Sequence, residues 1–188
     1  ADLTATYGLA KPGHFLHGGD MVGRLQVVDI GIPPEAVQSA KLKGGALDGA
    51  VFGTLPQRAN ASHKGSYGHL LLLAGSAGKT GAAILAARAA LRMGTGLVTL
   101  GVPVDLNPIF ETALAEAMTI PLPGSRSCLA IGDYSRILEQ LPGKSALVLG
   151  PGLGMHPDTQ ELVRKLYRET KLPMVVDADA LTIQARNP

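Results

Sequence analysis

A run of five aliphatic residues, followed at once by a glycine loop, constrains the fold of this chain more than any other feature. The run is Leu70-Leu71-Leu72-Leu73-Ala74, and Gly75-Ser76 ends it. A short apolar run without alternation is typical of a strand that is buried on both faces. Residues 81–94 follow; they are rich in alanine, carry only two charged residues and end on Gly94, which predicts a buried helix with a glycine C-cap. A buried strand joined to a buried helix indicates an α/β protein.

The alternation of short strands and helices continues along the chain. Further strands are expected at 97–102, 116–120, 146–149 and 174–176, the second of them ended by Pro121 and Pro123. Helices are expected between them at 106–115, 132–141 and 157–170. Weaker patterns near the start predict strands at about 2–7 and 24–30 and a short helix near 34–41. Such an order predicts a mostly parallel sheet with right-handed crossovers, whose ligands bind in the loops after residues 74, 101, 149 and 176.

Composition excludes several classes of protein. Seventeen Lys and Arg against fifteen Asp and Glu leave a net charge of +2, with no basic run, so we expect no nucleic-acid partner and no membrane partner. The longest apolar run is far shorter than the roughly 20 residues that cross a bilayer. The single cysteine, Cys128, favours a reducing compartment, and we expect a cytoplasmic protein. The five histidines lack ligand spacing, so no metal site is expected.

The glycine loop after the first buried strand resembles a P-loop but lacks its length. Counting back from Gly78-Lys79-Thr80, the first glycine of the P-loop pattern would fall on Leu73, inside the strand. A P-loop NTPase is therefore rejected. Two alternatives stay open: a tight turn with Thr80 as N-cap, or an anion site at the helix N-terminus.

Two further segments follow strands. Gly150-Pro151-Gly152-Leu153-Gly154 has glycines at alternate positions, which favours a ligand loop over a plain turn, although the spacing fails the dinucleotide fingerprint. Asp177 and Asp179 would share one face of a continued strand. They could hold Mg²⁺, act as an acid/base pair, or cap the helix that follows.

Taken together, these segments resemble the ADP/ATP-dependent NAD(P)H-hydrate dehydratases. The similarity is carried, in the family's order, by His63-Lys64-Gly65-Ser66-Tyr67-Gly68-His69, Leu70 to Ala74, Gly75-Ser76, Gly81-Ala82-Ala83, Ala89 to Val98, Gly150 to Gly154, and Asp177 to Leu181. The resemblance implies a ribokinase-like layered fold with a mostly parallel sheet.

The start of the chain is similar to the end of a Rossmann-like NAD(P)H-hydrate epimerase domain. Tyr7 to His14, Val22-Gly23 and Val28 to Pro33 match its closing strands. We therefore expect an epimerase tail over 1–33, a linker over 34–61, and the first part of a dehydratase domain over 62–188, incomplete at its C-terminal side. This order is that of the bifunctional enzymes that repair hydrated nicotinamide nucleotides.

The resemblance implies a repair reaction on hydrated NADH or NADPH. The dehydratase would remove water at the expense of ADP or ATP, with Mg²⁺; the epimerase would use K⁺, and the full-length protein would be a homo-oligomer. Small residues would lie against the hydrated nucleotide: Ala83 and Gly154 as direct contacts, Ala82 and Gly152 behind them, and Gly75, Ser76 and Asp177 as weaker candidates.

The family's later motifs do not occur between residues 1 and 188. They are a His-Pro-Gly-Glu segment, a Lys-Gly-x-x-Thr loop and a Gly-Thr-Gly-Asp turn with the catalytic aspartate. We therefore expect a fragment that contains no catalytic residue and is inactive alone. Two alternatives stay open: the front of a ribokinase-type small-molecule kinase, and a non-catalytic nucleotide-binding module.

Overall fold

The computed structural model describes residues 1–16, 20–42, 49–54 and 58–186. The chain divides into two compact units, Ala1–Gln57 and Arg58–Pro188. The predicted epimerase tail, linker and dehydratase part remain predictions. Residues 17–19 of the tail, 43–48 and 55–57 of the linker, and 187–188 lie outside the described residues.

The first unit holds a two-stranded sheet. β1 (Leu3–Tyr7) and β2 (Arg24–Val28) pair in parallel, and both were predicted. The Lys11 ammonium donates to the Thr6 hydroxyl and to the Tyr7 carbonyl, both at 2.7 Å, and so holds the loop that follows β1. The helix α1 (Pro34–Ser39) and a 3-10 turn (Gly49–Thr54) follow. Among the described residues of this unit only Thr6 is buried, so they form no hydrophobic core.

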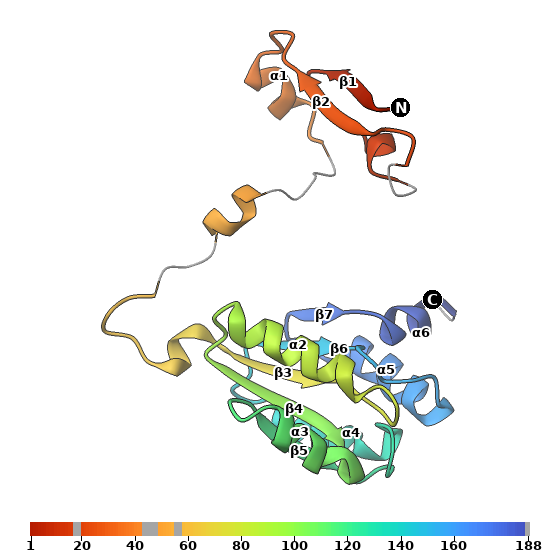
Figure 1. The fold of residues 1–188 in the computed structure, drawn as a ribbon. Helices are drawn as coiled ribbons and strands as arrows, with labels where there is room; N and C mark the ends of the chain where they lie inside the picture. The colour runs from red at the N-terminus through yellow and green to blue at the C-terminus, as the bar shows by residue number, and fades with distance from the viewer. Residues whose placement is uncertain (17–19, 43–48, 55–57, 187–188) are drawn as a thin grey trace. The chain divides into compact units, whose positions relative to one another are not determined.

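The second unit is built on a five-stranded, all-parallel sheet in the order β5-β4-β3-β6-β7 (Figure 1). The strands are β3 (His69–Leu73), β4 (Leu97–Pro103), β5 (Met118–Leu122), β6 (Ala146–Leu149) and β7 (Met174–Val176). The apolar residues Leu70 to Leu73 thus lie in the central strand, β3, which has neighbours on both edges and helices on both faces.

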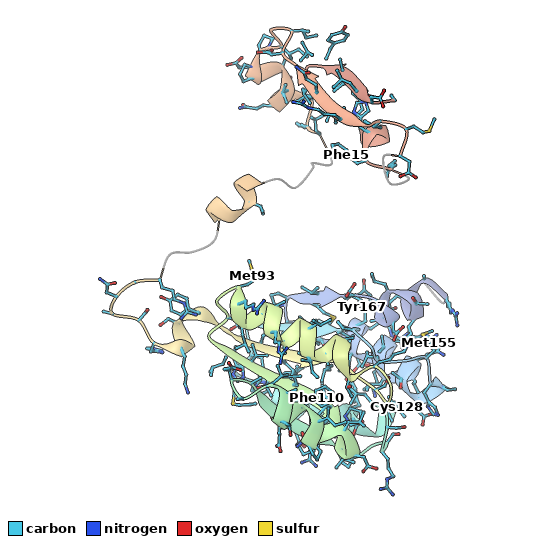
Figure 2. The ribbon with its side chains drawn as sticks, in the orientation of Figure 1. Phe15, Met93, Phe110, Cys128, Met155 and Tyr167 are labelled. Carbon is cyan, nitrogen blue, oxygen red and sulfur yellow. The ribbon has the colours of Figure 1, made fainter. Side chains whose placement is uncertain are left out.

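Helices cover both faces of this sheet (Figure 1). They are α2 (Thr80–Arg92), α3 (Asn107–Ala113), α4 (Tyr134–Gln140), α5 (Pro157–Glu169) and α6 (Asp179–Arg186). Successive side chains of β3 point to opposite faces. Leu72 packs with α2 and α3 around Phe110, the largest fully buried side chain (Figure 2). Leu71 and Leu73 pack with α4, α5 and α6 on the other face. The result is a three-layer α/β/α fold.

The chain winds in two directions from β3. It first runs through α2 to β4 and through α3 to β5, and then returns past β3 to β6 and β7. The two directions part between β3 and β6. Ligands of open parallel sheets bind at such a switch point, outside the carboxyl ends of the strands.

Two boundary predictions were wrong. Thr80, considered as the N-cap of the helix after β3, is the first residue of α2, and Lys79 is the N-cap. Pro121, expected to end a strand at 116–120, lies inside β5, where it pairs with Val102. β5 is an edge strand, so only one side of its backbone needs hydrogen bonds, and an edge tolerates a residue without an N–H.

Candidate functional site

The loops after β3 and β6 are joined at the switch point. The Gly75 N–H donates to the Pro151 carbonyl at 2.9 Å. The Ser76 hydroxyl, almost fully buried, donates to the Gly152 carbonyl at 2.8 Å. Two segments that are 76 residues apart in sequence therefore form one rigid wall at the carboxyl edge of the sheet.

The glycines of this wall are required by the contact between the two loops. Gly152 has φ +67°, and a Cβ there would lie 2.7 Å from the Lys79 carbonyl oxygen and 3.0 Å from the Ala82 Cβ. At Gly75, with φ +83°, a Cβ would lie 2.9 Å from the Phe110 ring. A side chain at either position would force the loops apart. Close approach of protein to protein thus accounts for both glycines before any ligand is considered.

The predicted contact residues lie together, at different depths. Ala83 is fully buried in the core beneath Gly75, and half-buried Ala82 lies beside Gly152. Gly154 is half-buried, and a Cβ on it would lie 3.4 Å from the Ser76 hydroxyl oxygen. Contact of these residues with a nucleotide stays a prediction.

Asp177, the remaining candidate, is exposed on the third loop, directly after β7. Its amide donates to the Leu149 carbonyl at 3.0 Å, and its own carbonyl accepts from the Ala180 N–H at 3.1 Å. The backbone of Asp177 therefore fixes the start of α6. A role for its side chain stays a prediction.

An ion pair that the sequence argument did not anticipate closes the site. The Lys79 ammonium, from the loop before α2, lies 3.0 Å from Asp179 Oδ2, on the first turn of α6. The same oxygen accepts from the Gly154 N–H at 2.8 Å. One carboxylate thus joins the three loops that follow β3, β6 and β7. The signal was present in the sequence, since Lys79 belongs to the rejected P-loop pattern and Asp179 to the Asp pair.

The environment keeps Asp179 ionised. Burial alone would raise the pKa of its carboxyl, but the hydrogen bonds from the Gly154 N–H and Lys79, with the charge of Lys79, outweigh burial. The pKa of Asp179 therefore lies below its ordinary value. Lys79 remains about half exposed, so its other N–H groups face solvent at the mouth of the site.

The loop after β5 adds a rim to the site. The Ser127 carbonyl accepts from the Ala77 N–H at 2.8 Å, which attaches this loop to the loop after β3. Fully buried Asp133 holds its ends by accepting from the N–H groups of Gly124 at 2.6 Å and Ala130 at 3.0 Å.

The start of α2, beside these loops, suits an anion. The first N–H groups of a helix have no partner within the helix, and the N-terminus carries a partial positive charge. Those of α2 lie next to Lys79, and around Gly78 and Gly81 the structure leaves open space where a Cβ would be. A phosphate group of a nucleotide matches this arrangement.

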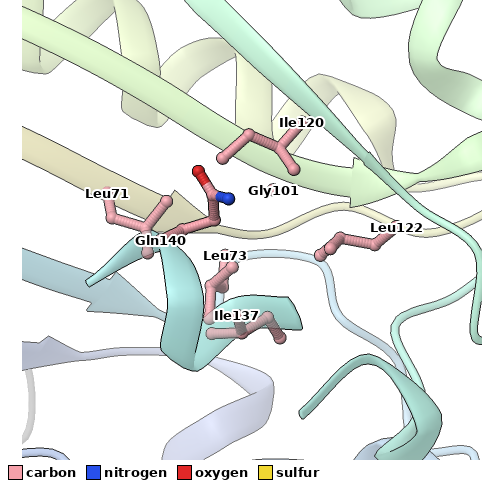
Figure 3. A pocket seen from close by; sticks show the side chains of 7 residues that line it. All are labelled: Leu71, Leu73, Gly101, Ile120, Leu122, Ile137 and Gln140. Atoms are coloured by element: carbon pink, nitrogen blue, oxygen red, sulfur yellow. The ribbon is translucent and has the colours of Figure 1, made fainter. Parts of the chain in front are cut away.

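Neither the core of the second unit nor a cluster of metal-binding side chains offers a comparable site among the described residues. An apolar gap beside Gly101 lies between the sheet and α4 (Figure 3), but it is too narrow to admit a water molecule. Within the described residues, no group of three His, Cys, Asp or Glu side chains is placed to hold a metal ion. Over the same residues, no helix combines the length and the apolar character that a bilayer crossing needs.

The class of protein follows from the fold. The structure of a ribokinase-like superfamily protein from Enterococcus faecalis superposes with a TM-score of 0.59 at 22% identity, over 70% of this chain and 44% of that one. This similarity establishes a ribokinase-like fold, as the sequence predicted.

The chain belongs to the NAD(P)H-hydrate dehydratase family, whose sequence model matches residues 70–188. It is similar to the bifunctional NAD(P)H-hydrate repair enzyme of Moorella thermoacetica, with 40% identity over 98% of this chain and 36% of that protein. It is also similar to the ADP/ATP-dependent NAD(P)H-hydrate dehydratase of Bacillus subtilis, crystallised with ATP and Mg²⁺, with 34% identity and a TM-score of 0.56 over 70% of this chain and 44% of that one. The chain thus spans about a third of the length of the bifunctional relative.

Proposed function

We propose that the protein to which this chain belongs dehydrates hydrated NADH and NADPH at the expense of ADP or ATP, and that its switch-point loops hold the hydrated nucleotide. The observation that carries the proposal is the junction of three loops by Asp179, next to the α2 N-terminus, inside the segment that the family model matches. The similarity to a bifunctional relative over 98% of the chain further supports a coupled epimerase activity.

The chemistry requires a better leaving group than hydroxide. Phosphoryl transfer from the nucleoside phosphate to the hydroxyl of the hydrated ring forms a phosphate ester and releases the shortened nucleotide. Loss of phosphate from the ring, together with a proton from the neighbouring carbon, then restores the double bond. The residues of this chain would bind the hydrated nucleotide and orient it. The wall that contacts it would consist of Ala82, Ala83, Gly152 and Gly154, with Gly75, Ser76 and Asp177 beside it. Lys79 and the N-terminus of α2 would balance the negative charge of the phosphate. Mg²⁺ would accompany the phosphate donor.

Other properties of the whole protein are part of the same proposal. K⁺ would serve the epimerase, the full-length protein would be a cytoplasmic homo-oligomer, and neither nucleic acid nor a membrane would be a partner.

Turnover by the full-length protein tests the function. Hydrated NADPH is incubated with ADP or ATP, and the recovery of reduced-nicotinamide absorbance is followed. Lys79→Gln is expected to lower kcat/KM by about tenfold or more, because a charge-assisted contact to phosphate is lost. Lys144→Gln, at the amino end of β6, is the matched control and should retain wild-type turnover. A full-length protein that leaves hydrated NADPH unchanged with both nucleotides, but phosphorylates a small alcohol such as hydroxyethylthiazole, would overturn the proposal in favour of a kinase.

A further inference from the structure

A second basic site lies at the other end of α2. A groove of about 650 Å³ opens between the C-terminal half of α2 and the end of α3. Arg58, Arg88 and Arg92 line it, with Glu116 as the acidic residue in its wall. A groove of this volume is in the range of small-molecule sites, roughly 300–1,000 Å³.

The groove is separate from the switch-point site. The N-terminus of α2, at Thr80, belongs to the switch point, and Arg92 lies at the other end of the helix. At 1.5 Å per residue the two ends are about 18 Å apart. Thr95, which also lines the groove, lies just before β4, at the amino edge of the sheet.

Helix capping accounts for only part of these charges: Arg92 lies in the last turn of α2, where a cation complements the helix dipole. Arg88 and Arg92 are the two charged residues of α2, and they are spaced four apart on one face. Like charges at this spacing destabilise a helix by a few tenths of a kcal/mol. Among the residues that the structure describes, none of the three guanidinium groups forms an ion pair. The groove therefore keeps an excess of positive charge.

Backbone carbonyls hold two of the guanidinium groups in place without neutralising them. Arg58 Nη2 donates to the Gly94 carbonyl at 2.8 Å, and the group lies 4.5 Å from the centre of the Tyr67 ring. Arg88 Nη2 donates to the Ala113 carbonyl at 3.1 Å. Each carbonyl lies at a helix end and so accounts for one of the five N–H donors of its arginine. The other donors are fixed in direction, which favours bidentate binding of an oxyanion.

We propose that this groove is a second anion site that binds a phosphate-bearing metabolite of about nucleotide size. The three guanidinium groups would bind the phosphate, and the Leu91 and Ala113 side chains in the wall would contact the organic part. A concave site of limited volume in a chain with a net charge of only +2 fits a small molecule better than nucleic acid. The proposal does not depend on the dehydratase function.

Binding to the 188-residue chain tests the proposal, with ADP and inorganic pyrophosphate as probes and adenosine as the neutral comparison. Amide NMR shifts locate the bound probe. We expect shifts at residues 88–95 and 112–116 with a Kd below about 1 mM for ADP, weakened by added salt, and none there with adenosine.

Two double variants with the same change of net charge distinguish specific binding in the groove from non-specific electrostatic attraction of the anion to the chain. Arg88→Gln with Arg92→Gln should weaken binding at the groove by about tenfold or more. Arg136→Gln with Arg168→Gln, exposed on α4 and α5, should leave it unchanged. Lys79→Gln should also leave the groove shifts unchanged, while altering any shifts at the switch point.

Three results would overturn the proposal: no shifts in the groove at millimolar ADP or pyrophosphate, equal weakening by both double variants, or displacement of ADP from the groove by an acidic peptide or an oligonucleotide that binds more tightly. Because the readout is binding at named amides, its failure is distinct from failure of the dehydratase activity.

Discussion

At the scale of single residues, the site depends on groups that the fold itself uses. Gly152 is flanked by the Lys79 carbonyl and Ala82, and Ser76 gives its hydroxyl to the Gly152 carbonyl. The sequence argument explained these small residues by contact with a nucleotide. The structure shows that they are also needed for the packing of one loop against another. Both roles can coexist, because a wall that is tightly packed on its inner side can present its backbone on the outer side.

Gly152→Ala should lower the free energy of unfolding by about 2–4 kcal/mol. An alanine would combine a positive φ with a contact of 2.7 Å to a backbone oxygen, which cannot rotate away. Denaturant unfolding measures the effect. Gly81→Ala, on α2, is the matched control, since a Cβ at position 81 would have no atom within 4 Å. This substitution should raise the free energy of unfolding by up to about 1 kcal/mol. Equal stability of the two variants would contradict the packing role.

Asp179→Ala should cost about 1–2 kcal/mol of unfolding free energy at neutral pH, because the Gly154 N–H and Lys79 both lose their partner. The pKa of Asp179 lies below its ordinary value of 3.8, so its contribution is complete above that pH and is lost as the pH falls further. The difference between wild type and variant, measured by denaturant unfolding, should therefore shrink below pH 3.8. Lys79→Met, which leaves the Gly154 bond in place, should cost less. A pH-independent difference would rule out this role.

At the scale of elements, the central strand begins with a polar link. His69 Nε2 lies 2.7 Å from the Thr99 hydroxyl and so ties β3 to β4 at their amino ends. Burial, and then the charge of Lys144, lower the pKa of His69 below its ordinary value of 6.5. Burial and the nearby charge of Lys144 therefore favour a neutral imidazole at this link.

Acidification should weaken the fold through His69. A lowered pKa means that the unfolded chain binds the proton more readily, so the free energy of unfolding decreases as the pH falls below 6.5. In His69→Gln this part of the slope should disappear, as measured by denaturant midpoints at a series of pH values. An unchanged slope in the variant would show that other groups cause the pH dependence.

At the scale of the whole molecule, stability resides in the second unit. Its sheet has hydrophobic clusters on both faces, whereas the described residues of Ala1–Gln57 bury only Thr6. Burial of apolar surface is the main favourable contribution to folding.

Removal of residues 1–57 should leave one cooperative unfolding transition with an unchanged midpoint. Calorimetry measures the midpoint temperature of unfolding for the shortened chain and for the 188-residue chain. Near-ultraviolet circular dichroism checks that tertiary packing is retained. Loss of the transition in the shortened chain would show that the second unit requires the first.

Much of the architecture could be predicted from the sequence because its signals are local. The unbroken apolar run of β3, the alanine-rich α2 and the strand–helix alternation each determine an element, and the rule for parallel crossovers then limits the topology. The same signals predicted ligand-binding loops after residues 74, 101, 149 and 176, and the candidate site is built from the loops after β3, β6 and β7. The strand was expected to end before Pro121, whereas the proline lies inside it. The error arose because a proline is tolerated on an edge strand, and local sequence patterns do not reveal which strand lies at the edge.

The composition of the candidate sites was decided by tertiary structure, because a contact between two segments that are far apart in the sequence cannot be inferred from either segment alone. Lys79 and Asp179 are 100 residues apart, and each had a plausible local explanation as part of a turn or a cap. Likewise, Arg58 meets Arg88 and Arg92 only because α2 runs back toward the amino edge of the sheet, where β3 begins. Local sequence patterns thus determined the elements and the family of this protein. Which side chains share a site was decided by the order of the strands, since that order brings their loops to one edge of the sheet.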